Sequence, residues 1–399
     1  MRILIAGAGQ IGVALAKYLK AEKHEIILVD KNIQALTDLS EQLDIQTSVG
    51  NAALPSVLSR CGADGADIFL AVTGNDEVNL VSCTLAKKLF HVSKTVARVS
   101  SPDYQNTKYA SVAQALCVDV LVSPELETAH QILSSLSIPS ATDMTILGNG
   151  QVRFLGLKIK SGIPFIGKTL TQLRRQMGEM NFSIVSIIRH HRLMNIKDIT
   201  LKENDEVYFF VDTGHLSYVL DAFGCSEEKL NYVLMFGGGN IGYQTAKLLE
   251  IEPDEPEITL VEQDKKRAEL LAENLEKTLV IHGDGFDEDL SDEIEYKNNQ
   301  ISIATTHSDE NNVLLSLLAK KTGVNRTCAL VRNDLYKQYL QGLGVDILII
   351  PNAVMVSSIL RHLRHGRLAS DYFLQSGMGE VMEMDALKTA RIVGTPLGR

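Results

Sequence analysis

The sequence predicts an α/β fold of two tandem Rossmann-like, doubly wound parallel sheets, each followed by a small α+β module. Three observations support this prediction: a glycine-rich strand–turn–helix pattern at the start of the chain, a second copy of it far downstream, and apolar strands that alternate with helical stretches. Buried parallel strands carry near-continuous apolar runs, and their alternation with helices is typical of doubly wound folds. We therefore expect one fold to occur twice in these 399 residues.

The first glycine-rich pattern starts with the apolar run 3–6, which leads into Gly7-Ala8-Gly9-Gln10-Ile11-Gly12. A helical pattern follows, and a second apolar run, 26–29, ends in Asp30. In such a turn Gly7 permits the tight bend, Gly9 lets the backbone approach a pyrophosphate, and Gly12 allows close packing of helix and sheet. The helix N-terminus favours phosphate. Asp30 is placed to accept hydrogen bonds from a ribose 2′-hydroxyl, which favours NAD or an adenosine nucleotide over NADP.

The second copy reads Gly237-Gly238-Gly239-Asn240-Ile241-Gly242 and is followed by a helical pattern and a strand that ends in Glu262. Each glycine of the motif lies 230 residues after its first counterpart, as 237 follows 7. Further landmarks repeat as well, because Gly283-Asp284 lies 233 residues after Gly50-Asn51, and the segment 308–312 lies 233 after 75–79. Matching offsets that drift by a few residues indicate a tandem duplication. The alternative is that both loops are merely tight turns.

The elements between these landmarks follow one order. After residue 30, the patterns predict helices at 33–43, 54–59, 77–90, 103–116 and from Pro124, separated by strands at 47–49, 68–72, 95–99 and 118–122. Short alternating stretches with turn residues between them, from about 141 to 225, predict a small α+β module without a phosphate loop. Residues 379–399 loosely repeat the start of this module, so its second copy is expected to be truncated. The predicted domains are therefore 1–138, 139–228, 229–367 and 368–399.

Composition excludes several other classes of protein. With 45% apolar and 22% charged residues the chain can bury full-sized cores. No apolar run approaches the ~18 residues that span a bilayer, and a strand pattern starts directly after Met1, so we expect a soluble protein without a signal peptide. A net charge of −10 without a basic block argues against nucleic acid as a ligand. The scattered cysteines form no CxxC pattern, which indicates buried thiols rather than a metal site or a disulfide framework.

These features together resemble the TrkA family, the peripheral cytoplasmic subunits of bacterial Trk potassium-uptake systems, which are built of RCK (also called KTN) domains. The most specific parts of the resemblance are Gly74-Asn75-Asp76-Glu77-Val78-Asn79, its partner Ser308-Asp309-Glu310-Asn311-Asn312, and the duplication itself. The resemblance implies binding of NAD(H) or ATP/ADP without chemical turnover. It also implies a dimeric or tetrameric ring of this chain on the inner face of the membrane, where ligand-driven changes would gate a Trk-type potassium-transporting subunit.

The candidate nucleotide-binding residues follow from the motif and, for several positions, from this resemblance. Asn51 departs from the aspartate usual at the end of the third strand, whereas Asp284 keeps it. Thr73 and Thr305 are expected to end the fourth strands, and Arg98 to end the fifth strand with Arg332 at a similar place in the second half. The resemblance makes Arg98 and Arg332 candidates for outer phosphates, although surface ion pairs would explain them too. Helix capping equally explains the residues that start the helix after the fourth strand. The full set is Gly7, Gly9, Gln10, Ile11, Gly12, Asp30, Asn51, Thr73, Asn75, Glu77, Arg98, Gly237, Gly239, Asn240, Ile241, Gly242, Glu262, Asp284, Thr305 and Arg332.

The main alternative is an NAD-dependent dehydrogenase. Such an enzyme normally brings a substrate domain with a proton-handling His, Lys or Tyr beside the nicotinamide. The module at 141–225 offers no such cluster with convincing partners, and hydride transfer does not need two nucleotide domains. A third hypothesis for the function is a nucleotide-bound scaffold that acts without a channel.

Overall fold

The computed structural model describes most of the chain. The described residues are 1–104, 111–136, 138, 141–178, 181–190, 192–196, 199–225, 230–252, 256–287, 300–333, 344–363, 368–373, 379–384, 386 and 393–394.

The first half forms a six-stranded parallel sheet with the strand order β3-β2-β1-β4-β5-β6. The four residues 68–71 are fully buried, as are 3–6, which explains the uninterrupted apolar runs of these central strands. The strands are β1 (Arg2–Ala6), β2 (Glu25–Asp30), β3 (Gln46–Val49), β4 (Ile68–Ala71), β5 (Lys94–Arg98) and β6 (Val120–Val122). The helices are α1 (Gln10–Ala21), α2 (Ile33–Leu43), α3 (Pro55–Arg60), α4 (Asp76–Lys88), α5 (Ser111–Ala115) and α6 (Pro124–Leu136).

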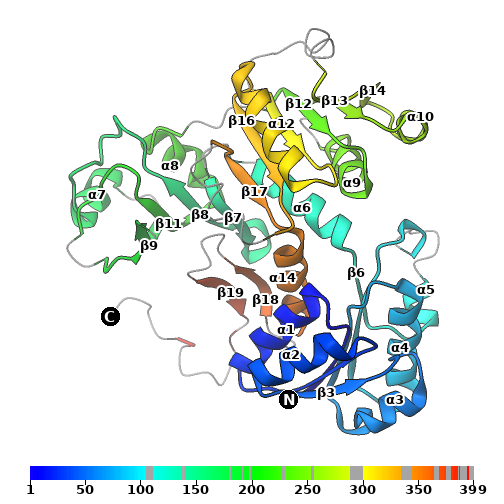
Figure 1. Cartoon of the computed structure of the whole chain (residues 1–399). Coiled ribbons are helices and arrows are strands. Elements are labelled where there is room, and N and C mark those ends of the chain that lie inside the picture. The colour runs from blue at the N-terminus through cyan, green and yellow to red at the C-terminus, as the bar shows by residue number, and fades with distance from the viewer. Residues whose placement is uncertain are drawn as a thin grey trace. The chain divides into compact units, whose positions relative to one another are not determined.

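The second half repeats this sheet in the equivalent order β14-β13-β12-β15-β16-β17, again with parallel neighbours. The strands are β12 (Tyr232–Phe236), β13 (Glu257–Glu262), β14 (Leu279–His282), β15 (Gln300–Ala304), β16 (Arg326–Leu330) and β17 (Ile347–Ile349). The helices are α9 (Asn240–Leu249), α10 (Lys265–Asn274), α12 (Asp309–Lys321) and α14 (Pro351–Leu363). The predicted pair of doubly wound sheets is thereby confirmed (Figure 1).

The α+β module after the first sheet is a five-stranded sheet with the order β10-β9-β11-β8-β7, in which neighbouring strands are antiparallel. Its apolar face packs against two short helices, and its largest buried side chains include Phe209 and Phe223. The elements are β7 (Ala141–Leu147), β8 (Val152–Lys158), α7 (Leu170–Met177), β9 (Phe182–Arg189), β10 (Arg192–Leu193), β11 (Glu206–Asp212) and α8 (Leu216–Ala222).

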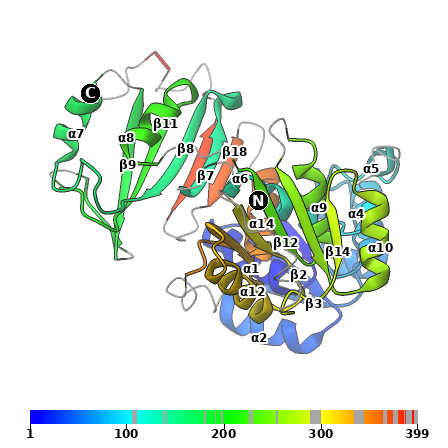
Figure 2. The same ribbon diagram turned by 90° about the horizontal axis from the view of Figure 1, so that it is seen from above.

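A second antiparallel pair, β18 (Leu368–Phe373) and β19 (Glu380–Met384), lies beside this module. Strand β18 contacts β7 (Figure 2). Val381 joins an apolar cluster with Leu147, Phe154 and Tyr208 on the face of the module's sheet. The backbone N–H of Gly148 donates to the Glu383 carboxylate over 2.8 Å. Strand β19 is thus fixed to the sheet of the preceding module.

The compact units of the chain cut across the two sequence repeats. One unit comprises Met1–Thr128 together with Ile350–His365, and the other comprises Ala129–Ile349 and Gly366–Arg399. Helix α14 follows the last strand of the second sheet in sequence, yet it packs on α1 and β6 of the first (Figure 1). Met355, Ile359 and Leu360 of this helix are fully buried. The predicted boundary at residue 367 therefore describes the sequence repeat but not the packing of its last helix.

Among the described residues, no helix combines the length and the apolarity that crossing a bilayer would require. The cysteines are free thiols, and burial raises the pKa of the Cys328 thiol to about 12. The described residues contain no cluster of three or more His, Cys, Asp or Glu side chains that could hold a metal ion.

Candidate nucleotide site at the first glycine-rich turn

Two of the three motif glycines are required by the protein's own packing. Gly7 adopts a φ of +112°, and a Cβ there would lie 2.9 Å from the backbone nitrogen of Thr73. A Cβ on Gly12 would lie 1.8 Å from the carbonyl oxygen of Gly7, so helix α1 can start this close to the turn only without a side chain. The second half shows the same geometry, with a φ of +95° at Gly237 and a distance of 2.1 Å for a Cβ on Gly242.

Gly9 differs from both, because nothing inside the protein requires a glycine there. Its φ of −74° and ψ of −178° describe extended backbone that any residue can adopt. An added Cβ would have no atom within 4 Å. Gly239 has similar angles, φ −59° and ψ −173°. The space above Gly9 is therefore free for an external group that approaches the backbone.

This space belongs to a cavity of about 520 Å³ at the carboxyl ends of the first sheet's strands. Cavities of this size and position are typical ligand sites of open α/β sheets. Of the predicted residues it brings together Gly7, Gly9, Gln10, Ile11, Asp30, Asn51, Thr73, Asn75 and Arg98. Gly12 and Glu77 are not in its lining, because Gly12 is buried beneath the turn and Glu77 is exposed in the first turn of α4.

The lining also contains residues that the sequence reasoning missed. Lys31 follows the predicted acid directly, and Gly74 lies inside a motif already singled out. Asn352, from the second repeat, carries no local motif. Only its packing on the first unit brings Asn352 to this cavity.

Asp30 organises the turn as well as facing the cavity. One carboxylate oxygen accepts from the Ala8 N–H over 2.6 Å, and the other accepts from the Asn32 N–H over 2.8 Å. A carboxylate offers about four lone-pair sites, so acceptor capacity remains for ribose hydroxyls. Glu262 repeats this arrangement, with 2.6 Å to the N–H of Gly238 and 2.9 Å to that of Asp264.

The side chains that start α4 have mainly structural tasks. The Asn79 amide is fully buried, accepts from the N–H and hydroxyl of Thr73, and donates to the carbonyls of Thr73 and Arg98. Asn75 caps the helix by accepting from the Val78 N–H over 2.7 Å. The Asp76 carboxylate accepts from the backbone N–H groups of residues 100 and 101. Capping and strand tethering thus explain the motif, while Asn75 also borders the cavity.

The described cavity wall contains two cations, Lys31 and the guanidinium of Arg98. Among the described residues, its Nε is shielded from solvent without a hydrogen-bond partner. Its Nη2 makes one long contact of 3.5 Å with the hydroxyl of Ser100. A planar guanidinium in a cavity wall suits a phosphate.

The second half corrects the prediction for Thr305. The Asn312 amide accepts from the N–H and the hydroxyl of Thr306, as Asn79 does from Thr73. Thr306 is therefore the counterpart of Thr73. Thr305 is 5% exposed, and its hydroxyl donates to the Gly237 carbonyl over 2.9 Å, so it stabilises the turn from beneath.

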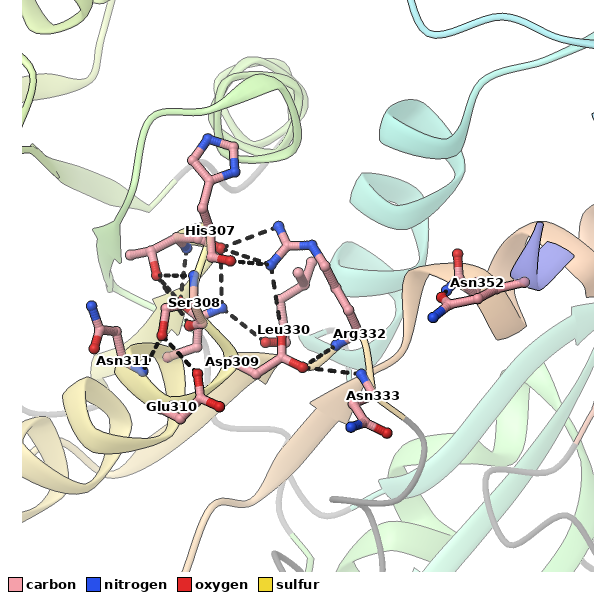
Figure 3. A network of polar contacts seen from close by, with 12 residues as sticks. His307, Ser308, Asp309, Glu310, Asn311, Leu330, Arg332, Asn333 and Asn352 are labelled. Carbon is pink, nitrogen blue, oxygen red and sulfur yellow. Dashed lines mark hydrogen bonds and ion pairs between the residues drawn. The ribbon is translucent and has the colours of Figure 1, made fainter. Parts of the chain in front are cut away.

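The prediction that Arg98 and Arg332 occupy similar positions is also wrong. The Asn312 amide donates to the carbonyl of Leu330, so Leu330 is the counterpart of Arg98. Arg332 corresponds to Ser100, because its N–H donates to the Asp309 carboxylate over 2.9 Å. Its guanidinium donates to the carbonyls of Thr306 and His307 and lies 3.6 Å from Asp309 (Figure 3). The donors of the Arg332 guanidinium are therefore used in contacts within the protein.

The remaining predicted residues of the second half keep their places around the turn. Asn240 and Ile241 start α9, and the Asp284 carboxylate accepts from the Phe286 N–H over 3.0 Å and from the Gln263 amide over 3.2 Å. His307 stands where the first half has Gly74, and its Nε2 lies 4.0 Å from the position of a Cβ on Gly239. Figure 3 shows its imidazole pointing away from the Arg332 network.

Comparison with known proteins fits this geometry. A family model, the TrkA-N domain, matches residues 3–124 and 233–351. The chain is 34% identical to the Trk system potassium uptake protein TrkA of Azorhizobium caulinodans, over 100% of this chain and 87% of that protein. It is 32% identical to the protein of the same name from Halomonas elongata, with the same coverage.

Solved structures of lower identity share the fold. The GsuK RCK domain matches 91% of this chain and 76% of its own with a TM-score of 0.63 and 20% identity. A GsuK channel bound to NAD matches 91% of this chain and 64% of its own with the same score and identity. The human SLO3 gating ring matches 91% and 83%, with a TM-score of 0.53 and 10% identity. From the duplicated TrkA-N match and the full-length relatives we conclude that the chain belongs to the TrkA family of Trk system potassium uptake proteins.

Proposed function

We propose that this chain is a nucleotide-sensing regulatory subunit that binds NAD(H) or ATP/ADP and gates a Trk-type potassium transporter from the cytoplasmic face of the membrane. The observation that carries nucleotide binding is Gly9, which faces a 520 Å³ cavity and has no protein-internal reason to lack a side chain. The names of the relatives support the link to potassium uptake. Among structures of the same fold, GsuK has been captured with NAD and with ADP.

The lining fits such a ligand in charge and shape. The turn at Gly9 and the first turn of α1, at Gln10 and Ile11, would receive the pyrophosphate, since a helix N-terminus favours anions. Asp30 would accept from ribose hydroxyls, and the terminal nitrogens of the Arg98 guanidinium would meet an outer phosphate. Asn51 and Thr73 would supply neutral donors and acceptors at the same edge.

The same lining disfavours a dehydrogenase. The described wall of the cavity contains no His, Tyr or Cys. Its lysine, Lys31, directly follows the residue proposed to hold a ribose. Proton transfer in a hydride-transfer reaction needs a group near the reacting carbon, and the wall offers none away from the ribose end. We infer that the bound nucleotide acts as a signal.

Gating requires differential affinity for two states. A nucleotide can shift a ring of subunits only by the difference between its binding free energies to the two states. A coupling of roughly 1–3 kcal/mol changes affinity by about 5- to 150-fold. Assembly of several copies into a homo-oligomeric ring would sum this coupling over the sites.

Replacement of Gly9 by valine tests nucleotide binding. The backbone angles and the open space at Gly9 accept a side chain, so we expect a folded protein whose cavity no longer admits a pyrophosphate. Titration calorimetry with NADH, ADP and ATP should show loss of binding, while circular dichroism stays unchanged. Gly239→Val is the matched variant for the second turn. Wild-type protein that binds none of these nucleotides, or a Gly9→Val protein that binds them normally, would reject the assignment.

The regulatory role has its own test. Potassium flux into vesicles that hold the membrane subunit should depend on this chain and respond to nucleotide. Native mass spectrometry of the purified protein should show an oligomer with retained nucleotide. Sustained NADH oxidation with a panel of 2-oxo acids would instead support an enzyme.

A further inference from the structure

Asn352 belongs to the second repeat by sequence and to the first unit by packing. It is the second residue of α14, a helix whose buried side chains pack on the first unit. Only Ile350 and Pro351 separate it from β17, the edge strand of the second sheet. One short peptide segment therefore connects the second sheet to the wall of the first cavity.

The Asn352 amide meets the phosphate side of that cavity. Its Nδ2 donates to the side-chain oxygen of Gln10, the first residue of α1, and both side chains line the cavity. Gln10 is exposed and Asn352 is half-buried, so neither amide is sealed away from a ligand. Asn352 (labelled in Figure 3) thus lies next to the helix N-terminus at which a pyrophosphate would bind.

The geometry points to Asn352 as a ligand-contacting residue that the second repeat contributes to the first nucleotide site. This inference rests on the proposed function and identifies helix α14 as the element that would respond to the bound nucleotide. Together with Gln10 it would donate a hydrogen bond to the phosphates or to the adjoining ribose hydroxyls of NAD(H). A neutral amide suits this task, because a carboxylate at the same place would repel the phosphates.

The mechanical consequence follows from the anchoring of α14. Its start contacts the cavity, while its far end is fixed to the first unit: the carbonyl of His362 accepts from the Lys94 ammonium, and Arg361 lies 3.9 Å from Glu127. Occupancy of the cavity would add a contact at the start of the helix. The nucleotide would thereby stabilise one position of the segment that continues into β17.

Three variants test this inference in the full chain with NADH as the probe. Asn352→Ala removes the donor at an accessible first-turn position and should weaken binding about three- to tenfold, the range for loss of one hydrogen bond. Asn352→Glu places a carboxylate there, as the repeat-related position has in Glu125, and should weaken binding more than tenfold. Ala353→Ser changes an exposed neighbour outside the lining and should bind as wild type does.

Hydrogen exchange provides the second measurement. NADH should slow amide exchange at residues 352–358 in the wild type and in Ala353→Ser but not in Asn352→Ala. A wild type that binds NADH, combined with Asn352 variants of equal affinity and unchanged exchange, would overturn the inference and leave the proposed function intact. A wild type that binds no nucleotide would instead remove the proposed function and this inference together.

Discussion

At the first glycine-rich turn Arg98 and Gly74 border an open cavity, whereas at the second turn the equivalent positions hold Leu330 and His307. The two turns have the same backbone conformation, with a positive φ at the first glycine. In both, a carboxylate accepts from the N–H of the residue that follows this glycine. The comparison separates two groups of residues. Those that build the turn make the same backbone contacts in both halves, while those that would meet the outer part of a ligand differ in chemistry.

The shared framework extends beyond the turn. In each half a buried asparagine joins the ends of two strands, and an aspartate accepts from the N–H and hydroxyl of a strand threonine and from a lysine. Burial alone would raise the pKa of Asp119, but hydrogen bonds from Lys87 and Thr95 lower it below the ordinary value. The repeated triads are Lys87, Asp119 and Thr95 in the first half and Lys320, Asp346 and Thr327 in the second. The halves therefore should respond alike to changes in the framework and differently to changes at the cavity.

The largest effect is expected from Gly12→Ala and Gly242→Ala. Each would push a methyl group to within 1.8 or 2.1 Å of a backbone oxygen, and such overpacking costs about 3 kcal/mol or more. Chemical denaturation followed by circular dichroism should show a destabilised half in both variants. Gly74→Ala, which meets open space, serves as the control. Wild-type stability of either motif variant would contradict the close approach described here.

The carboxylate of Glu250 forms a buried connection in the second half, whereas the first half has an exposed ion pair at the corresponding place. Burial alone would raise the pKa of Glu250, but hydrogen bonds from Lys277, Glu276 and Thr278 lower the pKa below the ordinary value. A lowered pKa in the folded state adds stability above the unfolded pKa, and this stability disappears as the pH falls through the folded pKa. Glu250→Gln should cost about 2 kcal/mol at neutral pH and progressively less in acid, as measured by urea denaturation between pH 7 and pH 3.

The matched variant in the first half is Lys20→Ala, which removes the exposed link between Lys20 and Asp44 at the corresponding place. Exposed ion pairs contribute little, so its urea midpoint should stay close to that of the wild type at every pH. A large loss in Lys20→Ala would show that the two connections are equivalent after all.

Arg98→Gln and Arg332→Gln compare the two arginines that the sequence had paired. Arg98→Gln should weaken ADP and ATP binding about tenfold, which corresponds to ~1.4 kcal/mol for a lost phosphate contact. Arg332→Gln should leave that binding unchanged and lower the thermal midpoint, since its guanidinium holds the carbonyls of Thr306 and His307. Calorimetry and thermal denaturation measure the two properties separately. The opposite pattern would assign the ligand contact to Arg332.

The smallest effect concerns the pair Gly74 and His307. Gly74→His should reduce NADH affinity at the first site by about two- to fivefold, because the imidazole would occupy part of the cavity wall. His307→Gly should improve binding at the second turn by a similar factor. Calorimetry gives both the affinity and the number of sites, and equal affinities in all three proteins would show that this position does not contact the ligand.

The sequence by itself determined the duplication, the order of strands and helices, and the turn residues around Gly7 and Asp30, because these depend on local pattern and repeat along the chain. The equivalence of single residues was predicted less accurately. Thr305 was paired with Thr73 and Arg332 with Arg98, whereas the structure pairs Thr305 with Val72 and Arg332 with Ser100. The offset of 233 that relates 75–79 to 308–312 already pairs Thr73 with Thr306, so this equivalence could be found from the sequence. Between that segment and the next strand the offset falls to 232, which pairs Arg98 with Leu330 and has no signal in composition. The position of Asn352 was decided by tertiary structure alone. Helix α14 buries its apolar face on the first unit, and an amphipathic pattern specifies that a face is buried but not which sheet receives it.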